Sequence, residues 1–366
     1  ALLQLELLGA ALVEDMILTD GSAFNVQWIG TKPVFIDIAS LEQLMPGDPW
    51  VGYCQFCQTS LFPLFLQAYK NVAFHSWLRG SIDGIAPEQC KNLMSFRDLF
   101  RPGVFTHVYL HAKLQATTAR TQRNVKAGLR SAGFNKALIQ ANVNRLSKLI
   151  RGLRWNDTRS TWSDYVANNS YSETDRDRKE RFVRSAVRSS PRTLVWDLGC
   201  NTGTYSKIAA EHADTVVAMD ADHLAVDRLY QSLKIEENHR ILPLLSNLVD
   251  ASPNLGWRGA ERKGLIERGK PDLALCLALI HHIVIGASVP LREFMEWLAS
   301  LGSDLVIEFV TKSDPMVQTL LRNKRDDYSD YEIGLFERLL SEAFHVANRE
   351  TLSSGTRTLY HAVARS

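Results

Sequence analysis

The sequence predicts an α/β fold for the C-terminal half of the chain, with a seven-stranded sheet, and a mainly helical accessory domain for the N-terminal half. Apolar runs of strand length alternate with helical segments from residue 193 onward, the order typical of strand–helix–strand units. One run ends in the segment 197–203, which places an aspartate and two glycines between a strand and a helix. The length of 366 residues leaves room for a second domain.

The first strand and the loop after it define the expected ligand crevice. Residues 193–196 are apolar and partly β-branched, and residues 205–210 are typical of a helix. Gly199 and Gly203 allow the backbone to turn sharply and to approach a ligand without a Cβ between them. Asn201, between the two glycines, is assigned to the same ligand contacts. The alternative is an ordinary strand-to-helix turn with incidental glycines.

The charge of this loop argues against a phosphate ligand. A dinucleotide loop has three glycines and offers a helix N-terminus to a pyrophosphate. Here two glycines lie four residues apart, and Asp197 precedes them with a charge that would repel phosphate. The loop therefore predicts a nucleoside that carries positive charge, such as S-adenosylmethionine (SAM). The segment resembles the first motif of the class I SAM-dependent methyltransferases, a Rossmann-like family.

The second strand ends in an acid at the spacing that one strand–helix–strand unit requires. Residues 215–219 are apolar and stop at Asp220, where a carboxylate can accept hydrogen bonds from ribose hydroxyls. The methyltransferase resemblance implies this role for Asp220. Asp222 offers a second carboxylate, although its position favours a helix N-cap.

A third strand, predicted over residues 240–246, leads to two polar candidates, Asn247 and Asp250. The resemblance implies that a side chain just past this strand binds the adenine edge, usually an acid. An amide oxygen can also accept from the adenine amino group. The choice between Asn247 and Asp250 stays open from the sequence.

The fourth strand, predicted over residues 272–280, is almost continuously apolar, as expected for a strand covered on both faces. Leu279 near its end is assigned to the cofactor site. His281 and His282 follow, near the expected reaction centre, where a neutral imidazole can take a proton from an acceptor hydroxyl or amine. The alternative is that one of them packs under the cofactor or bonds a backbone carbonyl.

Three further strands complete the expected sheet, over residues 305–310, 343–347 and 357–364. The turn signal at 353–355 is consistent with a hairpin, and the resemblance implies an antiparallel last strand. Glu308 is a candidate for the acceptor site, with a structural salt bridge as the alternative.

Composition is that of an ordinary soluble protein, with 45% hydrophobic residues, 22% charged residues and a net charge of +2. No apolar run reaches the roughly 18 residues that a bilayer-spanning helix needs, so no membrane partner is expected. The N-terminus lacks Met and has no basic signal-peptide region, which predicts a processed or partial chain. Five cysteines, an odd number, favour a reducing, cytoplasmic setting. Cys54 and Cys57 have the spacing of half a zinc site, but helix-core cysteines are favoured and no metal is predicted.

Residues 1–115 are predicted to form the accessory domain, with a helix over residues 2–17 and a hairpin from strands at 26–28 and 33–36. Asp20, Asn25 and Asp37 are similar in spacing to the catalytic loop and metal-binding aspartate of protein-kinase-like phosphotransferases. Neither a glycine-rich loop nor a phosphate-pairing lysine precedes them, which predicts a kinase-like remnant. The aromatic-rich stretches 50–77 and 96–109 are expected to form buried helices.

Residues 116–185 are predicted to be a basic helical connector and cofactor lid, and residues 186–366 the methyltransferase domain. Ten Lys or Arg and one acid lie within residues 118–160, which could bind nucleic acid, although a solvated or acid-paired face is favoured. Tyr171 in the lid is assigned to the cofactor site, and Tyr165 is a second candidate there or at the acceptor. Core packing is the alternative for both.

The resemblance covers about residues 162–366 and extends to bacterial methyltransferases labelled as nodulation proteins. It implies transfer of a methyl group from SAM to an oxygen or nitrogen of an acceptor that the sequence does not identify. The alternative is a catalytically silent cofactor-fold scaffold, or a nucleic-acid-binding protein that uses residues 118–160. The sequence gives no information on the oligomeric state.

Overall fold

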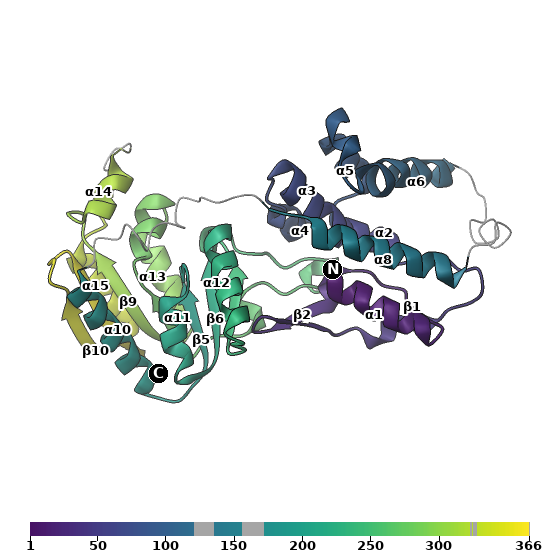
Figure 1. The fold of residues 1–366 in the computed structure, drawn as a ribbon. Helices are drawn as coiled ribbons and strands as arrows, with labels where there is room; N and C mark the ends of the chain where they lie inside the picture. Colours follow the sequence, from purple (N-terminus) through teal and green to yellow (C-terminus); the bar gives the residue numbers. More distant parts are fainter. Residues whose placement is uncertain (121–134, 156–171, 323, 325–327, 366) are drawn as a thin grey trace. The chain divides into compact units, whose positions relative to one another are not determined.

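The computed structural model describes residues 1–120, 135–155, 172–322, 324 and 328–365, the side chains of 116–120 excepted (Figure 1). The chain divides into two compact units. Unit 1 comprises Ala1–Trp28, Pro33–Asp157 and Pro253–Arg262, and unit 2 comprises Ile29–Lys32, Thr158–Ser252 and Lys263–Ser366.

Unit 2 contains a seven-stranded sheet in the order β10-β11-β9-β8-β5-β6-β7. Strands β5 to β9 pair in parallel, whereas β11 is antiparallel to both β9 and β10. The predicted seven-stranded sheet and its antiparallel last strand are thus confirmed. The strands are β5 (Arg192–Leu198), β6 (Ala213–Asp220), β7 (Ile241–Leu245), β8 (Leu273–Cys276), β9 (Asp304–Val310), β10 (Phe344–Thr351) and β11 (Arg357–Ala364).

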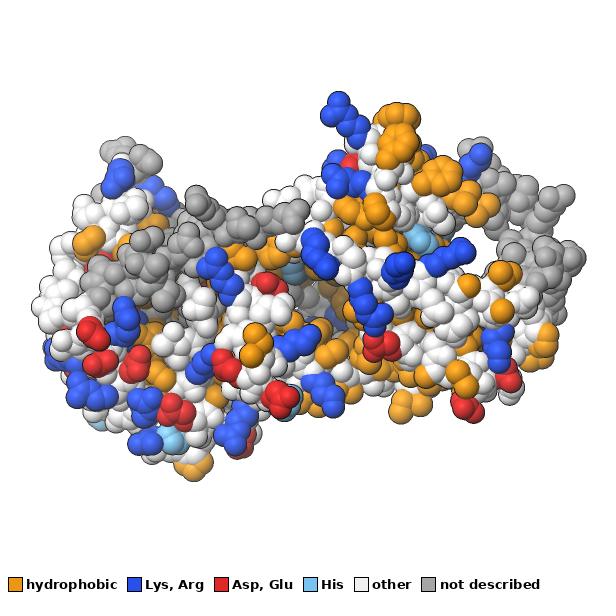
Figure 2. Space-filling model, viewed as in Figure 1, with side chains coloured by type: hydrophobic (Ala, Val, Ile, Leu, Met, Phe, Trp, Pro, Cys, Tyr) orange, Lys and Arg blue, Asp and Glu red, His pale blue; other side chains and the backbone are white. Residues whose placement is uncertain are grey.

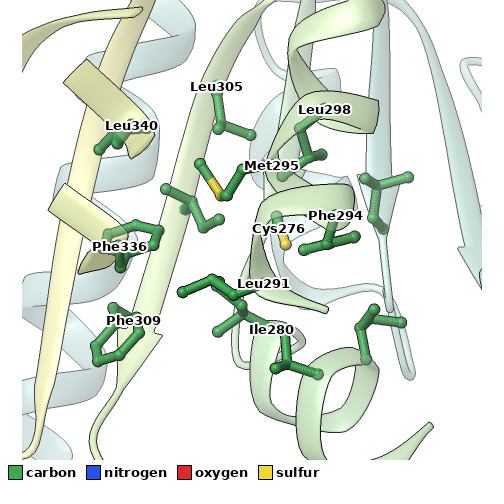
Figure 3. Close-up of a cluster of buried hydrophobic side chains, with 14 of the residues drawn as sticks. Cys276, Ile280, Leu291, Phe294, Met295, Leu298, Leu305, Phe309, Phe336 and Leu340 are labelled. Carbon is green, nitrogen blue, oxygen red and sulfur yellow. The ribbon is translucent and has the colours of Figure 1, made fainter. Parts of the chain in front are cut away.

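Helices cover both faces of this sheet and form two separate cores. One core joins the sheet to α10 (Glu173–Arg188), α11 (Thr204–Ala210) and α12 (His223–Ile235). The other core joins the sheet to α13 (Leu291–Ser300), α14 (Pro315–Leu321) and α15 (Ile333–Ala343). Figure 3 shows side chains of this core, among them Leu305 and Phe309 of β9. Neighbouring residues of one strand enter opposite cores, as Val306 and Ile307 do, because successive strand side chains point to opposite faces.

One predicted strand is longer than the strand found. The apolar run 272–280 forms a strand only over β8, Leu273–Cys276. Ala278 has a φ of 51°, a left-handed conformation that a regular strand does not accommodate. The apolar residues after it therefore leave the sheet, and a helical turn begins at Ile280.

The two edge strands of the sheet each carry an irregularity. In β7, Ser246 N donates to Asp220 O and Val216 N donates to Arg240 O, so even-numbered residues face β6. Pro243 consequently presents its nitrogen, which bears no hydrogen, to the open side. In β10, the pairing with β11 shifts between Val346 and Asn348, which leaves a bulge at Ala347.

Unit 1 is mainly helical. It contains α1 (Leu2–Val13), α2 (Tyr53–Phe56), α3 (Phe62–Lys70), α4 (His75–Gly80), α5 (Pro87–Leu93), α6 (His111–Arg120) and α8 (Lys136–Gly152), with π-helical turns η3 (Cys57–Leu61) and η5 (Phe105–Leu110). The expected helix over residues 2–17 ends at Val13, because Met16–Leu18 (β1) pairs with Leu41–Gln43 (β4). The predicted hairpin is present as β2 (Val26–Ile29) and β3 (Lys32–Phe35).

The aromatic stretches of unit 1 differ from the expectation of buried helices. Phe56, Phe62 and Phe65 are buried, as expected. Phe96 and Phe100, in the 3-10 helix η4 (Phe96–Phe100), are 75% and 81% exposed, and Phe105 is 60% exposed. The expectation is therefore wrong for the second stretch.

Two basic residues of the stretch 118–160 pair with acids of α1 and the turn that follows it. Lys136 bonds Asp15, and Arg151 Nη2 lies 3.0 Å from Glu6 Oε1. For these residues the acid-paired alternative holds. Residues 121–134, which contain other basic positions, lie outside the described part of the chain.

Candidate functional site

The loop after β5 makes its turn through left-handed residues. Gly199 and Gly203 have φ values of 76° and 83°, and Asn201 between them has 48°. The backbone N–H groups of Gly199 and Cys200 both donate to Met219 O, at 2.8 and 2.9 Å. These hydrogen bonds fix the loop to the end of the neighbouring strand β6. The left-handed conformations within the loop favour glycine.

Asp220, at the end of β6, ties this loop to the next one. Its Oδ2 accepts from Asn201 N at 2.8 Å, and its Oδ1 accepts from Asp222 N at 2.9 Å. Burial raises the pKa of Asp220, and these backbone hydrogen bonds oppose the shift. The backbone N–H of Ala221 is a third donor to this carboxylate, which leaves it room to accept a further one. Asp222 is the N-cap of α12, as expected, and accepts from Leu224 N and Ala225 N.

Asp197 lies beneath the loop and is 2% exposed. Its Oδ2 accepts from Ser206 Oγ at 2.5 Å, in the first turn of α11. Burial raises the pKa of Asp197 to about 6, against the hydrogen bond from Ser206. The Asp197 carboxylate therefore lies beneath the loop backbone and is not part of the surface of the crevice.

Asn247 and Asp250 occupy opposite ends of one short 3-10 turn, η6 (Leu248–Asp250). Asn247 is its N-cap, and Asn247 Oδ1 accepts from Val249 N at 3.2 Å. Asn247 lies on the cavity described below, whereas Asp250 does not line it.

Leu279 reaches the glycine loop because Ala278 turns the chain after β8. A Cβ built on Gly199 would lie 3.1 Å from Leu279 Cδ1, a contact tighter than normal packing. The left-handed conformation of Ala278 could not be predicted from the sequence, since alanine rarely has a positive φ.

The paired histidines take different positions. His282 lines the cavity, while His281 is fully buried behind it and does not line it. The two rings are in contact, with centroids 4.1 Å apart. Among the described residues, neither ring nitrogen of His281 has a hydrogen-bond partner.

Both histidines are held in the neutral form. Burial lowers the pKa of His281 well below its ordinary value, with His282 adding to the effect. Burial lowers the pKa of His282 to about 4, and the Arg357 guanidinium adds to it. His282 therefore presents a neutral ring at neutral pH, which can accept a hydrogen bond but binds a proton only weakly.

These loops enclose a cavity of about 210 Å³ at the carboxyl ends of the parallel strands, the position where open α/β sheets bind ligands. Six of the predicted site residues line it: Gly199, Asn201, Asp220, Asn247, Leu279 and His282. Asp197, Gly203, Asp250 and His281 are not among its lining residues. Tyr165 and Tyr171 lie outside the described residues.

Some residues of the cavity wall were not predicted from the sequence. Ser246, Val249, Ile283 and Ala287 also line the cavity. Ser246 and Val249 flank Asn247, so their place beyond the third strand was a usable signal. Ile283 and Ala287 come from the π-helical turn η9 (His282–Gly286) and its C-cap, which no sequence feature indicated.

Glu308 is not part of this cavity. It is fully buried in β9, with its Oε2 2.6 Å from Lys179 Nζ and its Oε1 3.5 Å from Arg357 Nη1. Arg357 also bonds Asp314 through Nε and Nη2, at 2.7 and 3.0 Å. Burial lowers the pKa of Lys179, and Glu308 opposes that shift. The salt-bridge alternative for Glu308 is the one found.

In the described part of the chain, no three His, Cys, Asp or Glu side chains meet in a way that suits a metal ion. Cys57 is buried in the core of unit 1, and Cys54 is partly exposed. None of the described helices combines the length and hydropathy of a membrane-spanning segment.

Comparison with known proteins identifies the family. Nodulation protein NoeA of Rhizobium meliloti (strain 1021) is 34% identical to the chain over 363 residues, which is 98% of the chain and 76% of NoeA. The chain belongs to the NoeA family. Its sheet order and glycine loop are those of the class I SAM-dependent methyltransferase fold. No family model matches the chain.

Solved structures overlap with part of the chain. N-methyltransferase NodS from Bradyrhizobium japonicum WM9, in complex with S-adenosylhomocysteine, is 15% identical and covers 56% of this chain and 97% of its own, with a TM-score of 0.41. Magnesium protoporphyrin IX methyltransferase from Synechocystis PCC 6803, also with S-adenosylhomocysteine, is 18% identical and covers 56% of this chain and 92% of its own, with a TM-score of 0.39. The family assignment rests on NoeA.

Proposed function

We propose that the cavity beside Asp220 binds SAM, and that the chain transfers its methyl group to an oxygen or nitrogen of an acceptor. The observation that carries the proposal is the Asp220 carboxylate, which lines the cavity and can accept from ligand hydroxyls beside its backbone donors. Two adjacent ribose hydroxyls are a matching pair of donors. The sheet order and the left-handed glycine loop, which are those of the class I methyltransferase fold, support the same ligand.

The rest of the cavity wall fits a nucleoside. Leu248, Val249 and Leu279 supply apolar surface for a flat base. The Asn247 amide can donate to a ring nitrogen or accept from an amino group at its edge. Gly199 leaves the backbone bare where the ligand would lie. Ser246 adds a hydroxyl to the polar edge of the cavity.

Bound SAM would supply a methyl group on a cationic sulfur, and the protein would supply alignment. In-line displacement depends chiefly on the position of the acceptor atom relative to the methyl group. His282 lies on the wall with a neutral ring, which can accept a hydrogen bond from the hydroxyl or amine of the acceptor and orient it, while the released proton passes to water. His281 packs behind it and supports its orientation.

Replacement of Asp220 by alanine should weaken SAM binding by about 10- to 100-fold, because two hydrogen bonds to a charged group are lost. Calorimetric titration with SAM and with S-adenosylhomocysteine measures the change. Asp250→Ala is the matched control, since this nearby acid does not line the cavity, and its affinity should stay at the wild-type value. Equal affinities of Asp220→Ala and wild type would refute the assignment, as would preferential binding of ATP or NAD over SAM.

The imidazole of His282 should not titrate in the range of an ordinary histidine. With a pKa lowered to about 4 from 6.5, it stays neutral as the pH falls through 6.5 and takes up a proton only well below that value. Histidine-selective NMR titration, with His282→Gln to assign the signal, measures this pKa. A midpoint for His282 near 6.5 would contradict the burial described here.

A further inference from the structure

Unit 1 carries apolar side chains that stand out into solvent. Phe96, Phe100 and Phe105 are the aromatic members, and Leu110 and Leu114 are 40% and 57% exposed. We call these five residues the aromatic surface. Figure 2 shows hydrophobic side chains gathered with Lys and Arg over α5 and α6. Contiguous exposed apolar surface of this kind marks an interaction site more often than isolated residues do.

The exposure of Phe96 and Phe100 is built into the turn that carries them. Asp98, between them, is buried, and its Oδ2 accepts from Lys70 Nζ, Ser95 N and Ser95 Oγ at 2.7–2.9 Å. Although burial opposes it, the hydrogen bonds from Lys70 and Ser95 hold the pKa of Asp98 well below its usual range. The anchored carboxylate keeps one side of η4 inward, and the two rings meet edge to face on the other side, with centroids 5.9 Å apart.

The remaining members continue along η5 and α6. Phe105 and Leu110 are separated by one turn of a π-helix, and Leu114 follows Leu110 at α-helical spacing. The segment η5 contacts α5, η4 and α6. The five side chains therefore come from packed neighbouring elements and not from a loose loop.

Cations outnumber acids on the elements of this surface. Arg97, Arg101 and Lys113 are exposed there, and Arg101 Nε pairs with Asp98 Oδ1 at 3.1 Å. Of the two acids there, Asp98 is buried in its hydrogen bonds and Glu88 pairs with Lys91. Among the described residues, no acid pairs with Arg97. The surface is thus apolar with a cationic rim.

We infer that the aromatic surface binds the face of an anionic lipid bilayer, with the phenyl rings in the interfacial layer and the arginines at the headgroups. Exposed rings next to cations suit such an interface, where apolar burial and attraction to anionic lipid act together. A second copy of the chain fits less well, because an isologous interface pairs the surface with itself and so brings two surfaces with an excess of cations together. Such a contact is peripheral and needs no helix that spans the bilayer.

Co-sedimentation of the full chain with lipid vesicles tests the inference. The wild-type chain should pellet with vesicles of phosphatidylcholine and phosphatidylglycerol, and less with phosphatidylcholine alone. Phe96→Ser combined with Phe100→Ser should lower the partition coefficient about a hundredfold, because each buried ring contributes about a factor of ten. Arg97→Gln should lower it about fivefold on the anionic vesicles only. Trp257→Ser is the matched control, an aromatic residue that is 78% exposed outside this surface, and should bind as wild type does.

Three results would overturn the inference. The first is a wild-type chain that stays in the supernatant with anionic vesicles, and the second is a double variant that binds as tightly as the wild type does. The third is a wild-type dimer in sedimentation velocity that the double variant converts to a monomer without any vesicle binding, which would assign the surface to a second copy. Unchanged thermal unfolding of the double variant shows that a loss of binding does not come from misfolding, since both rings are on the surface.

Discussion

Glu308→Gln should lower the free energy of unfolding by about 3–5 kcal/mol, because it leaves the buried Lys179 ammonium without its anion. The Lys179 Nζ lies 2.6 Å from Glu308 Oε2, and both side chains are almost completely buried. Arg357 loses a contact too but keeps its two hydrogen bonds to Asp314. Urea denaturation followed by circular dichroism measures the loss.

A partly exposed pair gives the control for this prediction. Glu350 lies 2.8 Å from Arg178, with about a third of each side chain exposed, and Glu350→Gln should cost about 1 kcal/mol or less. Removal of both buried charges, by Lys179→Met with Glu308→Leu, should recover most of the stability. If the double variant is as unstable as Glu308→Gln, or if Glu308→Gln costs no more than Glu350→Gln, the uncompensated charge is not the cause.

Gly203→Ala should destabilise the chain by about 2–5 kcal/mol, through backbone strain and a steric clash together. The residue has a φ of 83°, and an added Cβ would lie 2.4 Å from Leu229 Cδ1 in α12. Because Gly203 is the N-cap of α11 and belongs to the loop after β5, SAM binding measured by calorimetry should weaken as well.

Gly355→Ala separates the two causes. Gly355 has a φ of 67° and no atom within 4 Å of the added Cβ, so its substitution costs only the backbone strain of about 1–2 kcal/mol. A second comparison combines Gly203→Ala with Leu229→Ala, where the clash is removed. If the two single glycine variants lose equal stability, the contact with Leu229 contributes nothing.

The parallel sheet was predictable because burial on both faces leaves a direct trace in the sequence. Strands such as residues 193–196 and 305–310 are apolar runs of the right length, bounded by polar or turn residues. The acid at the end of the second strand was predictable for the same reason, since the carboxyl ends of parallel strands share one edge. Six predicted residues therefore meet at one cavity.

The failures come from conformation and packing that single residues do not encode. Nothing in the sequence distinguishes His281, which is fully buried, from its cavity-lining neighbour His282. Which of the two side chains faces the cavity depends on the left-handed conformation of Ala278 before them. Asp197 has the expected position in sequence, but its side chain turns to Ser206 beneath the loop. Phe96 and Phe100 were expected in a core, and the buried Asp98 between them holds the opposite side inward.

The irregular outer strands of the sheet bear on self-association. A polypeptide that extends a sheet needs a continuous row of unpaired N–H and C=O groups. Pro243 interrupts that row at β7, and the bulge at Ala347 twists it at β10. Neither flank offers a template for a foreign strand, so the chain is guarded against fibril growth and domain exchange through its largest sheet.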